Sequence, residues 1–248
     1  MPTQLSQVPE ALQSDFDIVG DSRFFADPQQ VFLDSLVKDP RDIVYTPHNG
    51  GHWLITSHEL AREVLSNAEL FGSFPIGIPA NMEQRPRLIP LESDAKEHRR
   101  YRRLLLPIFE PTAVARLQTG AEALAAEVLG EVLPTGEFDF LWKVAKPISM
   151  GLFVRQLGLE PERLDEFYAW ETGFYRAPTM EERIACGEKI GSYLFDVVTQ
   201  HVDHPKDDIV DMLLNVDVEG EKLSPEEVHA ICYLLFLASI DTVATMLS

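Results

Sequence analysis

A short run of small, acidic and hydroxyl-bearing residues near the end of the chain could carry proton chemistry. Residues 238–242 read ASIDT and lie within a stretch that is otherwise apolar on every helical face. A charged side chain in such a helix is costly unless it is paired or hydrated, so Asp241 needs an explanation. Thr242 can donate a hydrogen bond to the carbonyl of Ala238 and loosen the helix there. The set suits a proton relay beside a bound ligand, but spacing alone equally allows an arginine-paired carboxylate and a threonine that only packs.

A basic segment provides a second candidate site. Seven of the 21 lysines and arginines lie within residues 85–103. In a helix with Asp94 as its N-cap, His98 and Arg102 are one turn apart beside the apolar face, where they could bind a carboxylate. Arg99 and Arg103 point further towards solvent. The alternative is a solvated basic helix that pairs with the protein's own acids. The predicted apolar face consists of Tyr101, Leu104, Leu105 and Ile108.

Helices must position both sites, because apolar residues recur mostly at helical spacing. Asp94 with Glu97, and Ser224 with Glu227, have the spacing of helix N-terminal capping pairs. Strands at residues 42–45 and 53–56 are predicted to form a hairpin. No repeat or linker separates these elements, so one mainly α domain is predicted. The other predicted helices cover residues 28–38, 57–66, 114–132, 140–157, 161–175, 180–201, 208–215 and 225–248.

The last predicted helix is apolar on all sides, which requires burial in a large core or in a bilayer. A membrane span is disfavoured, because the rest of the chain is soluble in character and Asp241 interrupts the apolar run. No helix-ending signal precedes Ser248. We therefore expect the chain to be a truncated portion of a longer protein.

The charge balance limits the classes of partner. The chain has 21 basic and 40 acidic residues, which gives a net charge of −19. An acidic surface repels phosphate backbones and anionic lipid, so neither nucleic acid nor a membrane is an expected partner. The first residues lack the basic and apolar regions of a signal peptide, which predicts a cytoplasmic protein. Cys186 and Cys232 match no metal-binding spacing and are predicted to be small buried hydrophobic residues.

These motifs together resemble the cytochrome P450 superfamily, in particular the soluble bacterial enzymes near the camphor hydroxylase. Residues 94–103 are similar to the family's C-helix with its His-x-x-x-Arg signature. Residues 238–242 resemble its I-helix motif, and residues 49–53 (NGGHW) resemble the first hairpin of the camphor-type enzymes. The resemblance implies a mainly α cytochrome P450 fold with a small β hairpin. Residues 1–248 would be the N-terminal part of a single haem-monooxygenase domain, through the I-helix motif.

The resemblance also implies roles for individual residues. His98 and Arg102 would bind a propionate of haem b, and Ala238 would contact the same cofactor. Asp241 would deliver protons towards bound dioxygen, and Thr242 would stabilise the reduced oxygen species by hydrogen bonding.

Substrate and partner contacts follow from the same resemblance. The loop at residues 71–88, including Ile78 and Leu88, would lie over the substrate. Leu234 and Leu237 would face the substrate from the last helix. The exposed side chains of the basic helix that would dock a ferredoxin-type electron donor are Arg99 and Arg103.

Two departures from the family pattern affect these expectations. Ser239 stands where the family usually has glycine, which narrows the groove beside the iron. The family's Glu-x-x-Arg helix and its cysteine-ligand loop are absent, and neither Cys186 nor Cys232 lies in a sequence similar to that loop. The axial cysteine is therefore expected beyond Ser248, and the 248-residue piece alone is expected to be inactive.

The intact protein is expected to be a haem-thiolate monooxygenase. It would insert one oxygen atom of dioxygen into a small hydrophobic substrate of the terpenoid or aromatic class, with electrons from a ferredoxin. The alternative, from another class, is a helical binding or scaffold protein without redox chemistry.

Overall fold

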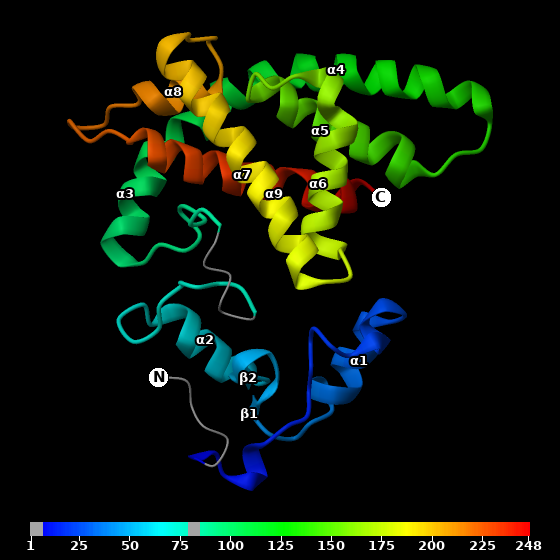
Figure 1. Cartoon of the computed structure of the whole chain (residues 1–248), viewed down its shortest axis with the longest axis vertical. Helices are drawn as coiled ribbons and strands as arrows, with labels where there is room; N and C mark the ends of the chain where they lie inside the picture. Colours follow the sequence, from blue (N-terminus) through cyan, green and yellow to red (C-terminus); the bar gives the residue numbers. More distant parts are fainter. Residues whose placement is uncertain (1–6, 79–84) are drawn as a thin grey trace. The chain divides into compact units, whose positions relative to one another are not determined.

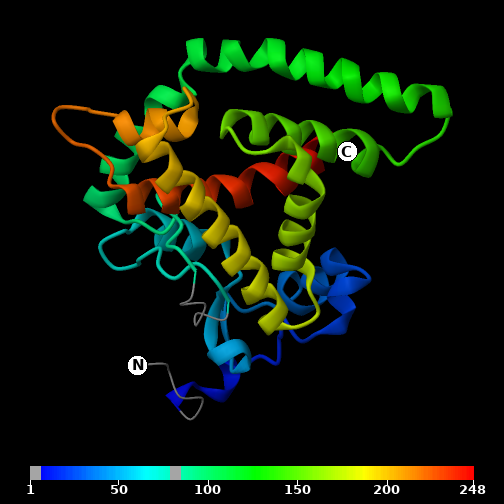
Figure 2. The same cartoon turned by 45° about the horizontal axis from the view of Figure 1, so that its top comes forward.

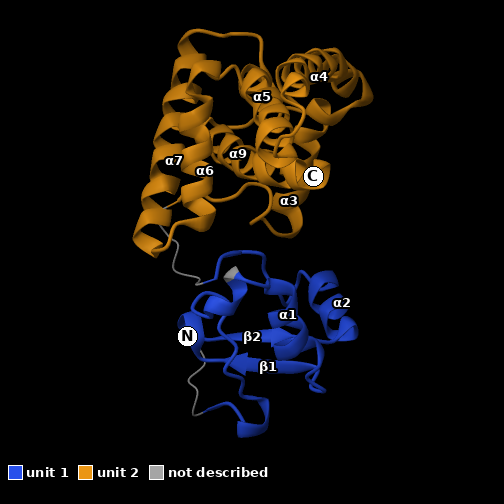
Figure 3. Ribbon diagram, turned by 90° about the vertical axis from the view of Figure 1, so that its right-hand side faces the viewer, with its two compact units in different colours: residues 1–83 blue, residues 84–248 orange. Residues whose placement is uncertain are grey.

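The computed structural model describes residues 7–78 and 85–248, and the chain forms two compact units, Met1–Glu83 and Gln84–Ser248 (Figures 1 and 3). The first unit is small and contains the only sheet among the described residues. The second unit consists of helices and carries both candidate sites. Each unit has its own set of internal contacts.

A two-stranded antiparallel hairpin organises the first unit. Strand β1 (Ile43–Thr46) pairs with β2 (His52–Ile55), and Thr46 lies opposite His52. Both predicted strands are therefore confirmed, each displaced by one residue. Helix α2 (His58–Ser66) follows the hairpin, and the Ser57 side chain caps it by accepting a hydrogen bond from the Leu60 amide.

Helix α1 (Pro28–Phe32) precedes the hairpin and continues as a π-helical turn, Leu33–Val37. The rings of Phe16, Phe24 and Phe32 contact one another with centroids 5.2–5.8 Å apart. Residues 71–78 form no helix or strand, as predicted for the start of the long loop. The part of that loop at residues 79–84 lies outside the described residues.

The second unit is built around its last helix, α9 (Pro225–Leu247), which contacts α5 (Lys146–Gln156), α7 (Met180–Asp203) and α8 (Ile209–Asn215) (Figure 2). Helix α6 (Leu164–Arg176) lies beside α7, and the long helix α4 (Pro111–Val132) covers α5. Helix α3 (Ala95–Leu105) contains the basic segment. The main helices expected from apolar spacing are all present.

The core of the second unit lies around α9. Phe236 is fully buried and makes edge-to-face contacts with Phe153 on α5 and Phe167 on α6, at centroid distances of 5.6 and 5.9 Å. By length and composition α9 could also span a membrane, a criterion that buried core helices satisfy too. Burial decreases near its end, where Ala238, Thr242, Val243, Thr245, Met246 and Leu247 are exposed. The helix is thus a core helix whose last turns are largely uncovered.

Candidate functional site

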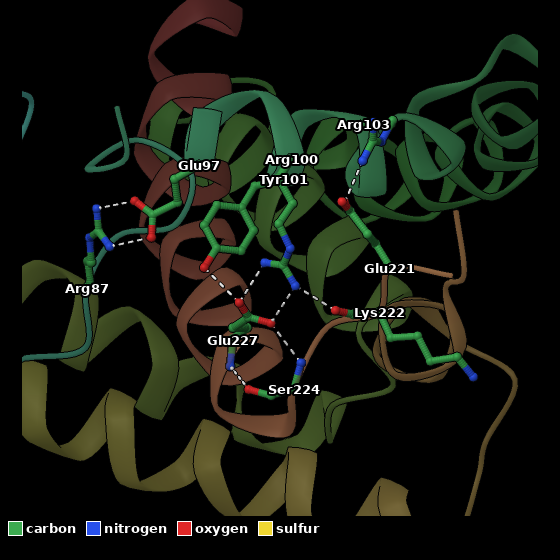
Figure 4. Close-up of polar contacts among 9 residues, drawn as sticks. All are labelled: Arg87, Glu97, Arg100, Tyr101, Arg103, Glu221, Lys222, Ser224 and Glu227. Atoms are coloured by element: carbon green, nitrogen blue, oxygen red, sulfur yellow. Dashed lines mark hydrogen bonds and ion pairs between the residues drawn. The ribbon is translucent and has the colours of Figure 1, made fainter. Parts of the chain in front are cut away.

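The first turn of α9 is joined to the basic helix α3 through Glu227 (Figure 4). Ser224 and Glu227 form the predicted capping box: the Glu227 amide donates to Ser224 Oγ at 3.2 Å, and the Ser224 amide donates to Glu227 Oε2 at 2.8 Å. The same carboxylate accepts hydrogen bonds from Arg100 Nη1 at 2.7 Å and from Tyr101 Oη at 2.8 Å. Spacing along the chain predicted the cap but not the second role of Glu227.

Burial alone would raise the pKa of the Glu227 carboxyl. The hydrogen bonds from Arg100, the Ser224 amide and Tyr101 outweigh burial, so the pKa lies below its usual value of 4.5. Glu227 is therefore ionised at neutral pH and holds α3 against α9.

The start of α3 differs from the prediction. Asp94 occupies the N-cap position, but its side chain makes no capping hydrogen bond. Glu97 instead forms a paired ion contact with Arg87 on the preceding loop, with Nη1–Oε1 2.8 Å and Nη2–Oε2 2.7 Å (Figure 4). The predicted capping function of this pair was wrong, because a nearby guanidinium competes for the glutamate more strongly than an uncharged backbone amide does.

The buried face predicted for this basic segment is confirmed: Tyr101, Leu104, Leu105 and Ile108 are all buried. His98 and Arg102 are exposed, and within the described part of the chain neither makes a hydrogen bond or an ion pair. These two side chains are thus available to a ligand.

The outer arginines of α3 differ from one another. Arg103 forms ion pairs with Glu221 and Glu219 in the loop before α9, the second at 3.7 Å. Arg99 is exposed and has no such pair within the described part of the chain. The interpretation of the basic helix as a partner for the protein's own acids therefore holds for Arg103 and Arg100, but not for Arg99.

Asp241 lies on the half-exposed side of α9. Its Oδ1 is 3.6 Å from Nη2 of Arg176, the last residue of α6, and its side chain is 36% exposed. The Thr242 hydroxyl donates to the carbonyl of Ala238, as predicted. The arginine partner that sequence spacing left open is therefore present, and the acid, the hydroxyl and the exposed Ala238 share one turn.

A buried charged pair lies one helix layer away from this turn. Lys146 Nζ on α5 is 3.8 Å from Glu171 Oε2 on α6, and each side chain is 3% exposed. Burial raises the pKa of the Glu171 carboxyl, as does the charge of Asp241, while Lys146 lowers it. The Lys146 ammonium also lies 4.1 Å from the centroid of the Trp142 ring. Sequence reasoning missed this pair, because its members belong to different helices and have no local pattern.

The residues predicted to contact substrate are not gathered in one place among the described residues. Leu88 and Leu237 are buried in the hydrophobic core of the second unit, and Leu234 is half-buried against it. Ile78 is 42% exposed in the first unit. Their assignment to substrate stays a prediction.

Sequence and structure comparisons show which known proteins this chain resembles. No family model matches the chain. The chain is 26% identical over 204 residues to a steroid C26-monooxygenase of Mycolicibacterium smegmatis, covering 77% of this chain and 48% of that protein. It is 27% identical over 211 residues to the probable cytochrome P450 127A1 of Sinorhizobium fredii, covering 83% and 51%. The crystal structure of CYP101J2 superposes with a TM-score of 0.77 and 27% identity, covering 99% of this chain and 61% of that one.

The chain resembles cytochrome P450 proteins over most of its length, and it has the cytochrome P450 fold. It spans about half the length of the curated relatives it matches, a coverage that fits an N-terminal portion.

The cofactor of this family is haem, iron protoporphyrin IX, and the helical residues fit part of it. His98 and Arg102 are exposed donors with no hydrogen-bond or ion-pair partner among residues 7–78 and 85–248, which suits the carboxylate of a propionate. Ala238 and Thr242 form an exposed, small-residue stripe on α9 that a flat macrocycle could approach.

The two thiols do not fit the thiolate ligand of the iron. Cys232 is completely buried, and burial raises the pKa of its thiol to about 12. Cys186 is half-buried on α7, close to Gly173 of α6. Cys232 therefore offers no accessible thiolate, and Cys186 does not lie in a sequence similar to the family's cysteine-ligand loop.

Proposed function

We propose that the intact protein is a haem-thiolate monooxygenase that inserts one oxygen atom of dioxygen into a small hydrophobic substrate. The observation that carries this proposal is the turn of α9 in which Asp241, paired with Arg176, adjoins the exposed residues Ala238 and Thr242. The resemblance to cytochrome P450 proteins supports the same reaction class. We also propose a cytoplasmic location.

His98 and Arg102 would hold the haem by donating charge-assisted hydrogen bonds to a propionate. When bound, haem supplies the binding and reductive activation of dioxygen. The chain's own contribution is proton handling. The Asp241 carboxylate is partly open to solvent and can take up a proton from it. Through solvent at this turn it can then exchange that proton with the Thr242 hydroxyl, which releases its own proton as it accepts one. The Arg176 guanidinium orients Asp241 for this step.

The substrate is proposed to be a terpenoid or an aromatic compound, with a steroid as a further possibility because related proteins are named steroid C26-monooxygenases. Electrons are proposed to come from a ferredoxin that docks on the exposed guanidinium groups of α3. Arg99 is better placed for this than Arg103, since Arg103 already contacts Glu221.

The test is an absorbance spectrum of the intact gene product, reduced and treated with carbon monoxide. A thiolate-ligated haem gives a strongly red-shifted Soret band. The 248-residue chain alone is expected to lack this band, because neither Cys186 nor Cys232 lies in a sequence similar to the family's cysteine-ligand loop. An intact product that binds no haem would overturn the proposal and favour a helical scaffold. Titration with terpenoid, aromatic and steroid compounds, read as a spin-state shift of the haem, would identify the substrate class.

A further inference from the structure

Four consecutive backbone carbonyls of α9, those of residues 237–240, each accept a hydrogen bond from a side-chain hydroxyl. The donors come from three different helices: Tyr175 on α6, Ser149 on α5 and Thr242 on α9 itself. These carbonyls belong to the turn that leads into Asp241. In residues 7–78 and 85–248, the other side-chain hydroxyls that donate to helix carbonyls, such as those of Thr135 and Thr199, do so at isolated positions.

Ser149 makes the most buried of these contacts. Its hydroxyl lies 2.6 Å from the Ser239 carbonyl oxygen and 3.1 Å from that of Ile240, and the residue is 4% exposed. A serine inside a helix commonly donates to a carbonyl of its own preceding turn. Ser149 instead donates across the interface between α5 and α9. Its one proton is shared between the carbonyls of the two peptide units that flank Ile240, and the second of these units joins Ile240 to Asp241.

A hydroxyl that donates to a helix carbonyl affects the helix hydrogen bond that this carbonyl already accepts. A carbonyl oxygen has two lone pairs, and in α9 one of them already accepts the amide four residues later. The Ser239 and Ile240 carbonyls therefore serve the amides of Val243 and Ala244 as well as the Ser149 hydroxyl. Competition of this kind weakens the helix bonds locally and lets the turn adjust. Because Ser149 is uncharged and buried, its effect on Asp241 and Thr242 is one of backbone position.

We propose that Ser149 is a positioning residue for the proton-handling turn. Its hydroxyl fixes the backbone of residues 239–240 against α5, and thereby sets where Asp241 and Thr242 lie and how readily their turn opens. This inference rests on the proposed function, in which Asp241 and Thr242 handle protons. The contact itself can be tested without haem.

The first measurement uses backbone carbonyl ¹³C shifts and residue-resolved amide exchange in the 248-residue chain. In Ser149→Ala, the carbonyl resonances of Ser239 and Ile240 are expected to shift. The amides of Val243 and Ala244 are expected to exchange roughly two- to ten-fold more slowly, the effect of one net hydrogen bond, since their acceptors lose a competitor. Ser149→Thr keeps the hydroxyl and should restore both signals.

Two control variants locate the effect. Tyr175→Phe removes the donor to Leu237 and should change only the Leu237 carbonyl and the amide of Asp241, its helical partner. Ser192→Ala, at an exposed serine of α7, should change neither. Unchanged carbonyl shifts in Ser149→Ala, or faster exchange spread evenly along α9, would show that Ser149 only packs, and would overturn the inference.

The second measurement uses the intact, haem-containing protein. Ser149→Ala should lower kcat with little change in KM, and Ser149→Thr should restore kcat. Equal kcat in all three proteins would contradict a positioning role even if the carbonyl shifts move. An intact product without haem would instead contradict the proposed function and leave the carbonyl result standing, so the two failures are distinguishable.

Discussion

Glu227 Oε1 on α9 accepts a hydrogen bond from Arg100 Nη1 on α3 at 2.7 Å, while the other oxygen of the same carboxylate caps its own helix. One side chain therefore starts α9 and fixes the basic helix to it. His98 and Arg102 lie on α3 and Asp241 lies on α9, so this joint sets the distance between the two candidate sites.

The joint predicts a pH dependence of stability. The pKa of Glu227 in the folded protein lies below the usual 4.5, because hydrogen bonds from Arg100 and its neighbours outweigh burial. The ionised Glu227 carboxylate therefore contributes to the free energy of unfolding above pH 4.5. This contribution is lost as the pH falls through the pKa of Glu227 in the folded protein. Glu227→Gln should therefore be less stable than the parent at pH 7 and lose less stability on acidification. Urea unfolding between pH 7 and pH ~3 measures this.

The matched control for this experiment is Glu131→Gln, at an exposed glutamate of α4. It should follow the parent at every pH. Parallel unfolding curves for Glu227→Gln and the parent over the whole acid range would contradict the assignment.

Arg102 and Arg103 of α3 should differ in their contribution to haem affinity. Arg102→Ala should weaken haemin binding roughly ten-fold or more, because a propionate loses a charge-assisted hydrogen bond of about 1.5–3 kcal/mol. Arg103→Ala breaks a half-exposed ion pair with Glu221, which is worth about 0–1 kcal/mol of stability, and should leave haemin affinity unchanged. Spectroscopic titration with haemin compares the affinities of the two variants. Equal losses of affinity would show that Arg102 and Arg103 do not have the different roles assigned to them.

The buried pair Lys146 and Glu171 should behave as a coupled unit. Lys146→Met leaves a buried carboxylate without its cation, a loss of up to about 3–5 kcal/mol. Burial raises the pKa of Glu171 above 4.5, so it can escape part of this loss by binding a proton. The loss should therefore grow as the pH rises through the folded pKa of Glu171. Adding Glu171→Gln should recover most of the stability, and additive single and double losses would contradict the coupling.

Gly158 should tolerate no side chain. Its φ is +60°, and a Cβ there would collide with the Asp208 carboxylate, which lies 2.8 Å from Nε2 of the buried His201. Gly158→Ala should lower the unfolding free energy by about 1–3 kcal/mol. Gly120→Ala, inside α4 with open space around it, should raise it by about 0.5–1 kcal/mol. Thermal unfolding shows whether each substitution raises or lowers the unfolding temperature. Shifts in the same direction for both variants would contradict the different roles of Gly158 and Gly120.

Asp241→Asn tests the proton-handling role. In the haem-containing intact protein, turnover should fall roughly a hundred-fold or more, because proton transfer occurs after substrate has bound. Substrate affinity, read from the spin-state shift, should be nearly unchanged. Arg176→Lys keeps a positive charge near Asp241 and should retain more turnover than Arg176→Ala. An Asp241→Asn protein with parental turnover would exclude the relay.

Local signals in the sequence predicted the helices and their starts well. Ser57 and Ser224 cap the helices for which they were proposed, because a cap joins atoms only three residues apart. The same locality explains the Thr242 hydrogen bond to Ala238. Both strands of the hairpin were predicted, but the observed ladder lies one residue pair closer to the turn. It ends on the pair Thr46 and His52, because the shape of the turn decides where pairing begins.

Only the tertiary structure determined which charged and hydroxyl groups meet. The sequence contains several candidate arginines for Asp241, and the packing of α6 on the core selects Arg176. Glu97 had the spacing of a cap but pairs with Arg87, because the loop folds back over α3. Ser149 carries no local signal, and its acceptors lie 90 and 91 residues away. Periodicity and caps report on contacts within one helix, whereas these partners are chosen by how separate helices pack.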